Sequence, residues 1–223
     1  CVYEYLETSI YIYIVMEYLE NYKTLSEYDK LITDTFYKLI NNETNNNDLD
    51  IIENAGKIFN NLACAVNYLH ELDIVHSDIK PENILCDFAN GKIKFIDFGL
   101  SCKDGDCIFR KGGVLGRTES FIDPQLYNKI LDVMSNKKFE ITLGDRKASD
   151  IWSLGATYYD LLTSSVPLEN YLDENQRGRK NDFFKTYNYY DDPTRIYINK
   201  CLNYSNPDLN MDSIMNINPR LRK

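Results

Sequence analysis

A polar octet at residues 76–83, His-Ser-Asp-Ile-Lys-Pro-Glu-Asn, carries the side chains best suited to chemistry. Apolar dipeptides flank it on both sides, and this pattern predicts a loop held between two short strands. Such a loop can bring the carboxylate of Asp78, the ammonium of Lys80 and the carboxamide of Asn83 to one point. Phosphoryl transfer needs these three groups, as a proton acceptor, a cation for the moving phosphate and a metal ligand.

Each of these residues also has a purely structural interpretation. A loop aspartate such as Asp78 can form a turn with its own backbone, and a lone loop lysine such as Lys80 is ordinary solvated surface. A second motif, Asp97-Phe98-Gly99, follows fourteen residues after Asn83 and directly behind an apolar strand predicted at residues 92–96. The ordered pair of motifs favours the catalytic interpretation.

These two motifs resemble the catalytic loop and the metal-binding Asp-Phe-Gly of eukaryotic-type Ser/Thr protein kinases. The resemblance implies that Asp78 accepts the substrate hydroxyl proton and that Lys80 pairs with the γ-phosphate of ATP. It implies that Asn83 and Asp97 hold Mg²⁺, for which hard oxygen ligands are suited. A lysine at position 80 implies transfer to Ser or Thr, since Tyr kinases usually carry other residues there.

The nucleotide side is predicted around residues 10–16, a β-branched and aromatic run that suits a buried strand. By resemblance this strand is the last of the small lobe, with Met16 as gatekeeper. The backbone of Glu17 and Leu19 would then bond the adenine edge, and Leu85 would form the floor beneath it. An ordinary strand, turn and core leucine would look the same.

Two helices are predicted in the first half of the large lobe. Residues 26–40 form the first, with Ser26 as N-cap and Asp29 in a capping-box position, and the polar tract 41–47 is expected to be a flexible insertion. The second has apolar residues at a period near 3.6: Ile51, Ile52, Ala55, Ile58, Phe59, Leu62, Val66 and Leu69. In a kinase this helix runs under the catalytic loop, and we assign its apolar face to the core.

An activation segment is expected at about residues 97–125, because its composition is polar and irregular. It closes at Asp123-Pro124-Gln125, where kinases usually show Ala-Pro-Glu, and residues 126–147 resemble a family-specific insertion. Thr118 is expected to line the substrate groove, and Glu82 to face a basic substrate side chain or solvent. Cys102 and Cys107 lack the second pair of a zinc site, and the glycines at 112–116 precede no helix with a phosphate-binding fingerprint.

Four further residues are assigned structural support. Asp150 begins an Asp-x-Trp-x-x-Gly motif that resembles the start of the central large-lobe helix, and it would accept backbone N–H bonds from the catalytic loop. His76 is expected to pack near Phe98, and Gln125 to pair with Arg222 of a terminal Asn-Pro-x-x-Arg. Without the resemblance, Asp150 would be only a helix-start acid.

One departure from the family affects regulation. Ser77 stands where most kinases have an arginine that receives an activation-segment phosphate, and serine cannot form that bidentate charged pair. Cations within the segment are expected to be mobile and partly solvated: Lys103, Arg110, Lys111 and Arg117. We therefore expect activity that does not depend on activation-segment phosphorylation.

Composition indicates an ordinary globular protein of 223 residues with a net charge of −9. This charge argues against nucleic acid as the main partner and favours a protein substrate that is basic around its target hydroxyl. No run reaches transmembrane length, so no membrane partner is expected. Six irregularly spaced cysteines indicate free thiols in a reducing cytoplasm, and the asparagine-rich composition suggests an AT-rich genome, with a host-cell location if the source is a virus.

The expected fold is α+β and protein-kinase-like, mainly the helical C-lobe with a short catalytic β-region. One domain fragment spans residues 1–223, with the last small-lobe strand at 1–16, the hinge at 17–25 and the large lobe at 26–223. The chain shows no Gly-rich loop or strand lysine, so alone it is expected to be inactive. A pseudokinase acting as a scaffold or allosteric partner is the alternative, while Lys-Pro-Glu-Asn disfavours a lipid or small-molecule kinase.

Overall fold

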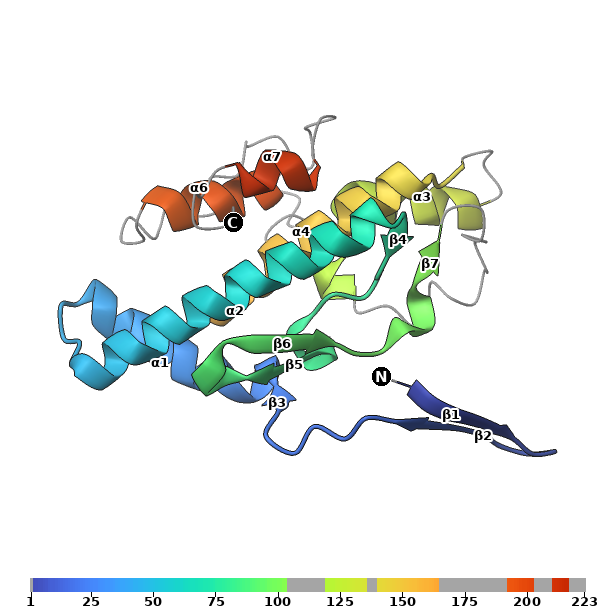
Figure 1. Cartoon of the computed structure of the whole chain (residues 1–223). Helices are drawn as coiled ribbons and strands as arrows, with labels where there is room; N and C mark the ends of the chain where they lie inside the picture. Colours follow the sequence, from blue (N-terminus) through green and yellow to red (C-terminus); the bar gives the residue numbers. More distant parts are fainter. Residues whose placement is uncertain (1, 104–118, 136–139, 165–191, 203–209, 217–223) are drawn as a thin grey trace.

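A computed structural model describes residues 2–103, 119–135, 140–164, 192–202 and 210–216 (Figure 1). Within these ranges, helices form the body of the molecule and short strands lie along one side of it. The strands form a three-stranded sheet and two two-stranded sheets. Thr118 and Arg222, like Cys107, Arg110, Lys111 and Arg117, lie outside the described residues.

The helical body is built around two long helices that pack together. The helices of the described residues are α1 (Asp29–Ile40), α2 (Asn46–Glu71), α3 (Pro124–Met134), α4 (Leu143–Thr163), α6 (Asp192–Cys201) and α7 (Met211–Met215). Helix α2 runs the length of the body with α4 beside it, and α6 and α7 cover a further side (Figure 1). None of the described helices is long and apolar enough to span a bilayer.

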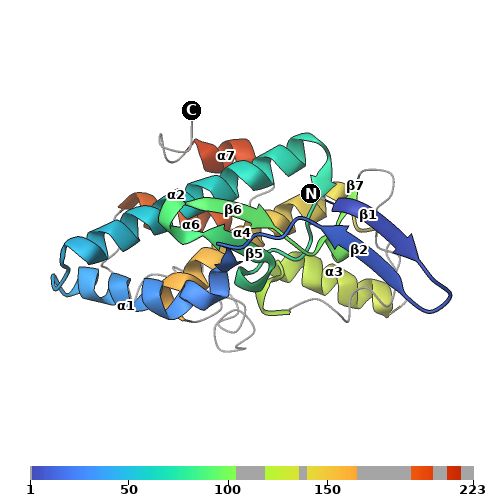
Figure 2. The ribbon, with the colours of Figure 1, turned by 60° about the horizontal axis from the view of Figure 1, so that its bottom comes forward.

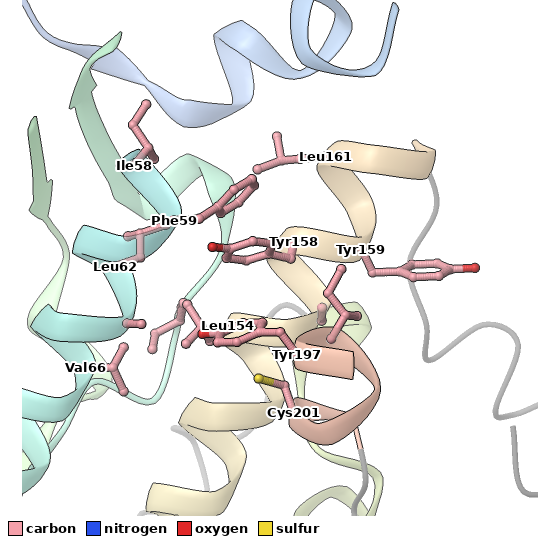
Figure 3. Packing of buried hydrophobic residues seen from close by; sticks show 14 of the residues in the cluster. Ile58, Phe59, Leu62, Val66, Leu154, Tyr158, Tyr159, Leu161, Tyr197 and Cys201 are labelled. Atoms are coloured by element: carbon pink, nitrogen blue, oxygen red, sulfur yellow. The ribbon is translucent and has the colours of Figure 1, made fainter. Parts of the chain in front are cut away.

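The periodic apolar residues predicted for the second helix form the centre of the core. Ile58, Phe59, Leu62 and Val66 of α2 are buried and face residues of α4 and α6 (Figure 3). The Phe59 ring stacks on that of Tyr158 of α4. A 3.6-residue period places these side chains on one stripe, so burying that stripe determines how α2 packs.

Both helix starts in this region differ from the prediction. A 3₁₀ turn at Leu25–Tyr28 precedes α1, and the Glu27 carboxylate accepts the Thr24 N–H (3.0 Å), so the cap lies two residues earlier than Ser26. The predicted insertion at 41–47 is shorter than expected: residues 41–45 form a turn and a short connection, and α2 already begins at Asn46. Its N-cap is Asn45, whose side chain accepts the Asp48 N–H (3.1 Å).

The small sheets hold the octet loop at both ends, as predicted. Strand β4 (Ile74–Val75) precedes the loop and pairs with β7 (Cys102–Lys103). Strand β5 (Ile84–Asp87) follows the loop and lies between β3 (Lys23–Thr24) and β6 (Lys92–Phe95). The two ends of the loop therefore belong to different sheets, and both sheets rest on the helical body.

The strand predicted at residues 10–16 is present, but the expectation that it is buried is wrong. Strand β2 (Ile12–Met16) pairs with β1 (Val2–Glu7) in an antiparallel hairpin whose residues are all exposed. The hairpin lies at the edge of the molecule in both views (Figure 1 and Figure 2). Its composition is that of a covered strand, yet no described element covers it.

Two further expectations need correction. Helix α4 begins at Leu143, so Asp150 lies in its third turn and is not a helix-start acid. Cys64, Cys86 and Cys201 are free thiols, as predicted, but Cys102 is disulfide-bonded. The partner of Cys102 lies outside the described residues, so cysteine usage supports a reducing compartment less than we expected.

Candidate active site

The catalytic groups predicted in the octet converge on one carboxylate oxygen. The Nδ2 of Asn83 donates to the Asp78 carbonyl oxygen (2.9 Å) and to Asp78 Oδ2 (2.7 Å). The Lys80 ammonium lies 3.1 Å from the same Oδ2. A 3₁₀ turn at Pro81–Asn83 folds the loop back, and its first hydrogen bond joins the Asn83 N–H to the Lys80 carbonyl (3.0 Å).

The Asp-Phe-Gly motif is attached to this loop through the backbone. The Ile96 N–H donates to the Asn83 carbonyl (2.9 Å), which extends the β5–β6 ladder and brings the next residue, Asp97, alongside Asn83. Asp97 has left-handed backbone angles (φ 59°), and its carboxylate accepts the Gly99 N–H (3.2 Å). The carboxylate is exposed, so it remains accessible to a ligand.

Asn83 and Asp97 suit an open magnesium site rather than a closed protein cage. Among the described residues, no group of three or more His, Cys, Asp or Glu side chains could hold a metal ion. Magnesium is usually held by only one or two protein oxygens, with the remaining positions taken by water and substrate phosphates. Because the Asn83 Nδ2 points at Asp78, its Oδ1 is turned away from Asp78 and is the oxygen that would ligate.

His76 packs beside Phe98, as the sequence led us to expect. Its ring is fully buried and lies 4.7 Å, centroid to centroid, from the ring of Phe98. Burial lowers the pKa of His76, so the ring is neutral. Its Nδ1 accepts the Asp78 N–H (3.3 Å), which leaves Nε2 to donate to the Ile96 carbonyl (3.1 Å). One neutral imidazole thus joins the catalytic loop to the strand before Asp97.

Asp150 accepts hydrogen bonds from the backbone at the start of the octet loop. Its carboxylate accepts the N–H groups of His76 and Ser77, both at 2.8 Å. The His70 Nε2 lies 3.2 Å from the same carboxylate. Ser77 has a positive φ of 67°, an uncommon conformation for a residue with a side chain, and the Asp150 bond helps to fix it. The buried His70 ring is therefore part of the same group of contacts.

The predicted nucleotide residues lie beside a contact that the sequence did not reveal. Leu85 is half-buried on β5 and pairs with Lys94 across β6. The Lys94 ammonium forms an ion pair with the half-buried carboxylate of Glu17. This hydrogen bond lowers the pKa of Glu17 and raises that of Lys94. The only sequence signal of the Glu17–Lys94 ion pair was the position of Lys94 between two apolar residues of β6.

Met16 and Leu19, at the two ends of the predicted nucleotide-binding segment, differ in their exposure to solvent. Met16 is exposed at the end of β2, while Leu19 is half-buried and its carbonyl accepts the Tyr22 N–H (3.1 Å). The roles of Met16, Glu17, Leu19 and Leu85 toward adenine remain predictions.

On the substrate side, Asp78 faces the end of the predicted activation segment. A small cavity between them is lined by residues 77–79, 121–122, Ser149 and Ser153. Glu82 is exposed next to the catalytic loop, as a substrate-facing carboxylate needs to be. Gln125 is also exposed, and its pairing with Arg222 and the groove role of Thr118 remain predictions.

Asp123 has a role that its motif did not suggest. It caps α3, and its carboxylate accepts the N–H groups of Gln125 (3.2 Å) and Leu126 (3.3 Å). Burial raises the pKa of Asp123 to about 6. An aspartate directly before a proline at a helix start was the available signal.

Comparison with known proteins agrees with this geometry. A family model described as the protein kinase domain matches residues 1–222. CBL-interacting protein kinase 21 of Oryza sativa subsp. japonica is 38% identical over 117 residues, which cover 51% of this chain and 19% of that protein. CBL-interacting protein kinase 2 of the same organism is 32% identical over 176 residues, covering 76% and 36% respectively.

A yeast relative and one solved structure extend the comparison. The Ser/Thr-protein kinase YPK1 of Saccharomyces cerevisiae is 38% identical over 116 residues, covering 51% of this chain and 14% of that protein. The chain thus matches well under half the length of each of these relatives. A rhoptry kinase from Toxoplasma gondii shares the fold, with a TM-score of 0.57, 16% identity, and coverage of 89% of this chain and 51% of that one. The family match over nearly the whole chain, joined to a loop that assembles Asp78, Lys80 and Asn83, shows that the chain belongs to the protein kinase family.

Proposed function

We propose that residues 1–223 form the catalytic large lobe and hinge of a Ser/Thr protein kinase that transfers the γ-phosphoryl group of ATP to protein hydroxyls. The observation that carries the proposal is the convergence of Asn83 and Lys80 on Asp78, within 2.7 and 3.1 Å of one carboxylate oxygen. Relatives named as Ser/Thr kinases support the choice of hydroxyl.

In this proposal Asp78 orients the substrate hydroxyl and receives its proton. The hydrogen bond from Asn83 and the ion pair with Lys80 hold the carboxylate in one rotamer, so little reorganisation precedes the reaction. Lys80 can then turn from Asp78 toward the phosphate as its charge moves. Bound Mg²⁺ would neutralise the phosphate oxygens, held by Asn83 Oδ1 and the Asp97 carboxylate.

Substrate choice is proposed to follow the charge around the loop. The exposed Glu82 carboxylate lies four residues after Asp78 and can pair with a basic side chain near the target hydroxyl. The net charge of −9 would assist the approach of such a substrate.

A pseudokinase is the second candidate, and Ser77 is the observation that favours it. Ser77 stands where the resembled kinase motif has an arginine, and its buried hydroxyl has no hydrogen-bond partner among the described residues. Against it, Asp78, Lys80, Asn83 and Asp97 are all present in a connected arrangement.

Phosphoamino-acid analysis separates these candidates. The longest natural protein that contains residues 1–223 is incubated with ATP, Mg²⁺ and a mixture of Ser, Thr and Tyr peptides, with and without an excess of chelator. The proposal predicts chelator-sensitive phosphoserine and phosphothreonine. Mainly phosphotyrosine would contradict the Ser/Thr assignment, and binding of ATP without any transfer would establish the pseudokinase.

A further inference from the structure

Arg146 is a buried residue whose Nε has no hydrogen-bond partner among the residues that the structure describes. It is the fourth residue of α4 and is only 6% exposed. Its Nε is buried with no hydrogen-bond partner, and its guanidinium makes no hydrogen bond or ion pair with any residue that the structure describes. A guanidinium nitrogen that has lost water without gaining an acceptor is unfavourable.

The two nearest carboxylates cannot supply what Arg146 lacks. Asp150 already accepts from His76, Ser77 and His70. Asp145 is occupied by the N–H and hydroxyl of Thr142. Burial lowers the pKa of Arg146, while the charges of Asp150 and Asp145 act to raise it. Both carboxylates are therefore close enough for a charge interaction with Arg146, but neither forms a hydrogen bond with it.

Arg146 lies one helical turn before Asp150, whose carboxylate binds the octet loop. On α4 it shares a face with Ser149, Asp150 and Ser153, since these positions follow it by three, four and seven residues. Asp150 binds the catalytic loop, and the two serines line the cavity that also contains Ser77. Ser77 Oγ is itself buried and has no hydrogen-bond partner. Ser77 and Arg146 thus each carry a buried polar atom without a partner among the described residues; Asp150 bonds the Ser77 backbone and lies one helical turn after Arg146.

We propose that Arg146 is the principal ligand of an oxyanion site that takes a phosphate group at the first turns of α4, beside the catalytic loop. A guanidinium presents five N–H donors in a fork that matches two oxygens of a phosphate. The third oxygen is free to accept from a hydroxyl such as that of Ser77. The N-terminal end of a helix also favours a negative charge.

This inference does not depend on the proposed catalytic activity. It does revise the expectation about phosphorylation, which counted only Lys103, Arg110, Lys111 and Arg117 as substitute cations and overlooked Arg146. The phosphate group can be a phosphoserine of this chain or free inorganic phosphate, and both present the same oxygens.

The test measures phosphate binding by the thermal unfolding midpoint of the 1–223 chain. Inorganic phosphate is titrated at constant pH and ionic strength, with chloride as the matched salt, on a sample treated with phosphatase and checked by mass spectrometry. We expect phosphate to raise the midpoint in a saturable manner. Arg146→Gln should weaken binding at least about tenfold, which corresponds to about 1.4 kcal/mol. Lys147→Gln, the control, removes the adjacent cation, which is bound to Asp73 and the His70 carbonyl, and should leave phosphate binding unchanged.

Two comparisons make the result decisive. If phosphate acts only after phosphatase treatment, a phosphoserine of the chain is the occupant; if it acts equally before treatment, free phosphate is. No phosphate effect in either sample, or an equal effect in Arg146→Gln, would overturn the proposal and leave water as the partner of the guanidinium. If Arg146→Gln does not fold, phosphate binding is measured with Arg146→Lys instead. Lysine keeps the positive charge but lacks the forked guanidinium, so unchanged phosphate binding by Arg146→Lys would also overturn the proposal.

Discussion

Asp150 is the residue on which the shape of the catalytic loop depends most. Replacing it by Asn leaves one oxygen but turns an NH₂ group toward a backbone N–H that now lies at 2.8 Å. We expect Asp150→Asn to lower the free energy of unfolding by about 3 kcal/mol, since a buried donor loses its acceptor. Urea unfolding measures this, with the exposed Asp50→Asn as control. Equal midpoints for both variants would show that Asp150 does not hold the loop.

The raised pKa of Asp123 leads us to expect that the free energy of unfolding depends on pH. Its folded pKa of about 6 lies above the ordinary 3.8, so between these values the folded chain binds more protons than the unfolded chain. Stability from this group is therefore greatest below about pH 4 and falls as pH rises to about 6. Asp123→Asn removes this titration, so its free energy of unfolding should vary less with pH between about 4 and 6 than that of wild type. Urea unfolding at a series of pH values measures this, and the same pH dependence in both proteins would contradict the account.

For single residues, the sequence predicted contacts that a motif implies, but it did not predict contacts that depend on how distant elements pack. The Asp150 bonds to the loop and the His76–Phe98 contact were expected, and both are present. The Glu17–Lys94 ion pair and the buried Nε of Arg146 were not predicted. Both depend on how segments that are distant in the sequence pack together, which no local sequence pattern encodes.

The contact between α4 and α6 depends on a glycine. A Cβ on Gly155 would lie 2.5 Å from the Cβ of Cys201 and 3.3 Å from Leu202, so the helices pack at a distance that only glycine allows. We expect Gly155→Ala to destabilise the fold by about 1–3 kcal/mol through overpacking. Gly56→Ala in α2 is the control, because a Cβ added at Gly56 would have no neighbour within 4 Å. Alanine is also more favourable than glycine inside a helix, by about 0.5–1 kcal/mol. Thermal unfolding should separate them, and two stabilised variants would contradict the close approach.

Elements with a strong period were predicted more accurately than their ends. The apolar stripe of α2 was predicted and is buried. The start of α1 was misplaced because Ser26 and Thr24 are both good caps, and a 3₁₀ turn separates the cap from the α-helix. The start of α4 was placed seven residues late because the family motif begins at Asp150, whereas the helix is capped by Thr142.

At the scale of the molecule, the β1–β2 hairpin is exposed along its whole length and is not covered by any other element of the described ranges. Every residue of both strands is exposed, and an isolated two-stranded hairpin is at best marginally stable in water. The β-branched and aromatic composition of residues 10–16 correctly predicted a strand, but the predicted burial was wrong, since burial depends on what covers the strand. We expect the 1–223 chain alone to transfer phosphate far more slowly than the about 1–100 s⁻¹ of typical kinases, because a poorly positioned ATP loses most of the catalysis. A steady-state assay showing ordinary turnover by this chain would contradict the expectation.

The most direct test of phosphoryl transfer through Asp78 is its rate in a single turnover. The longest natural protein that contains residues 1–223 is compared as wild type, as Asp78→Asn, and as Asp87→Asn, whose carboxylate only accepts from Asn90 at the surface. The account predicts that Asp78→Asn lowers the transfer rate by about 10²–10⁴-fold with little change in ATP affinity, while Asp87→Asn matches wild type. An Asp78→Asn protein that transfers phosphate at the wild-type rate would contradict it.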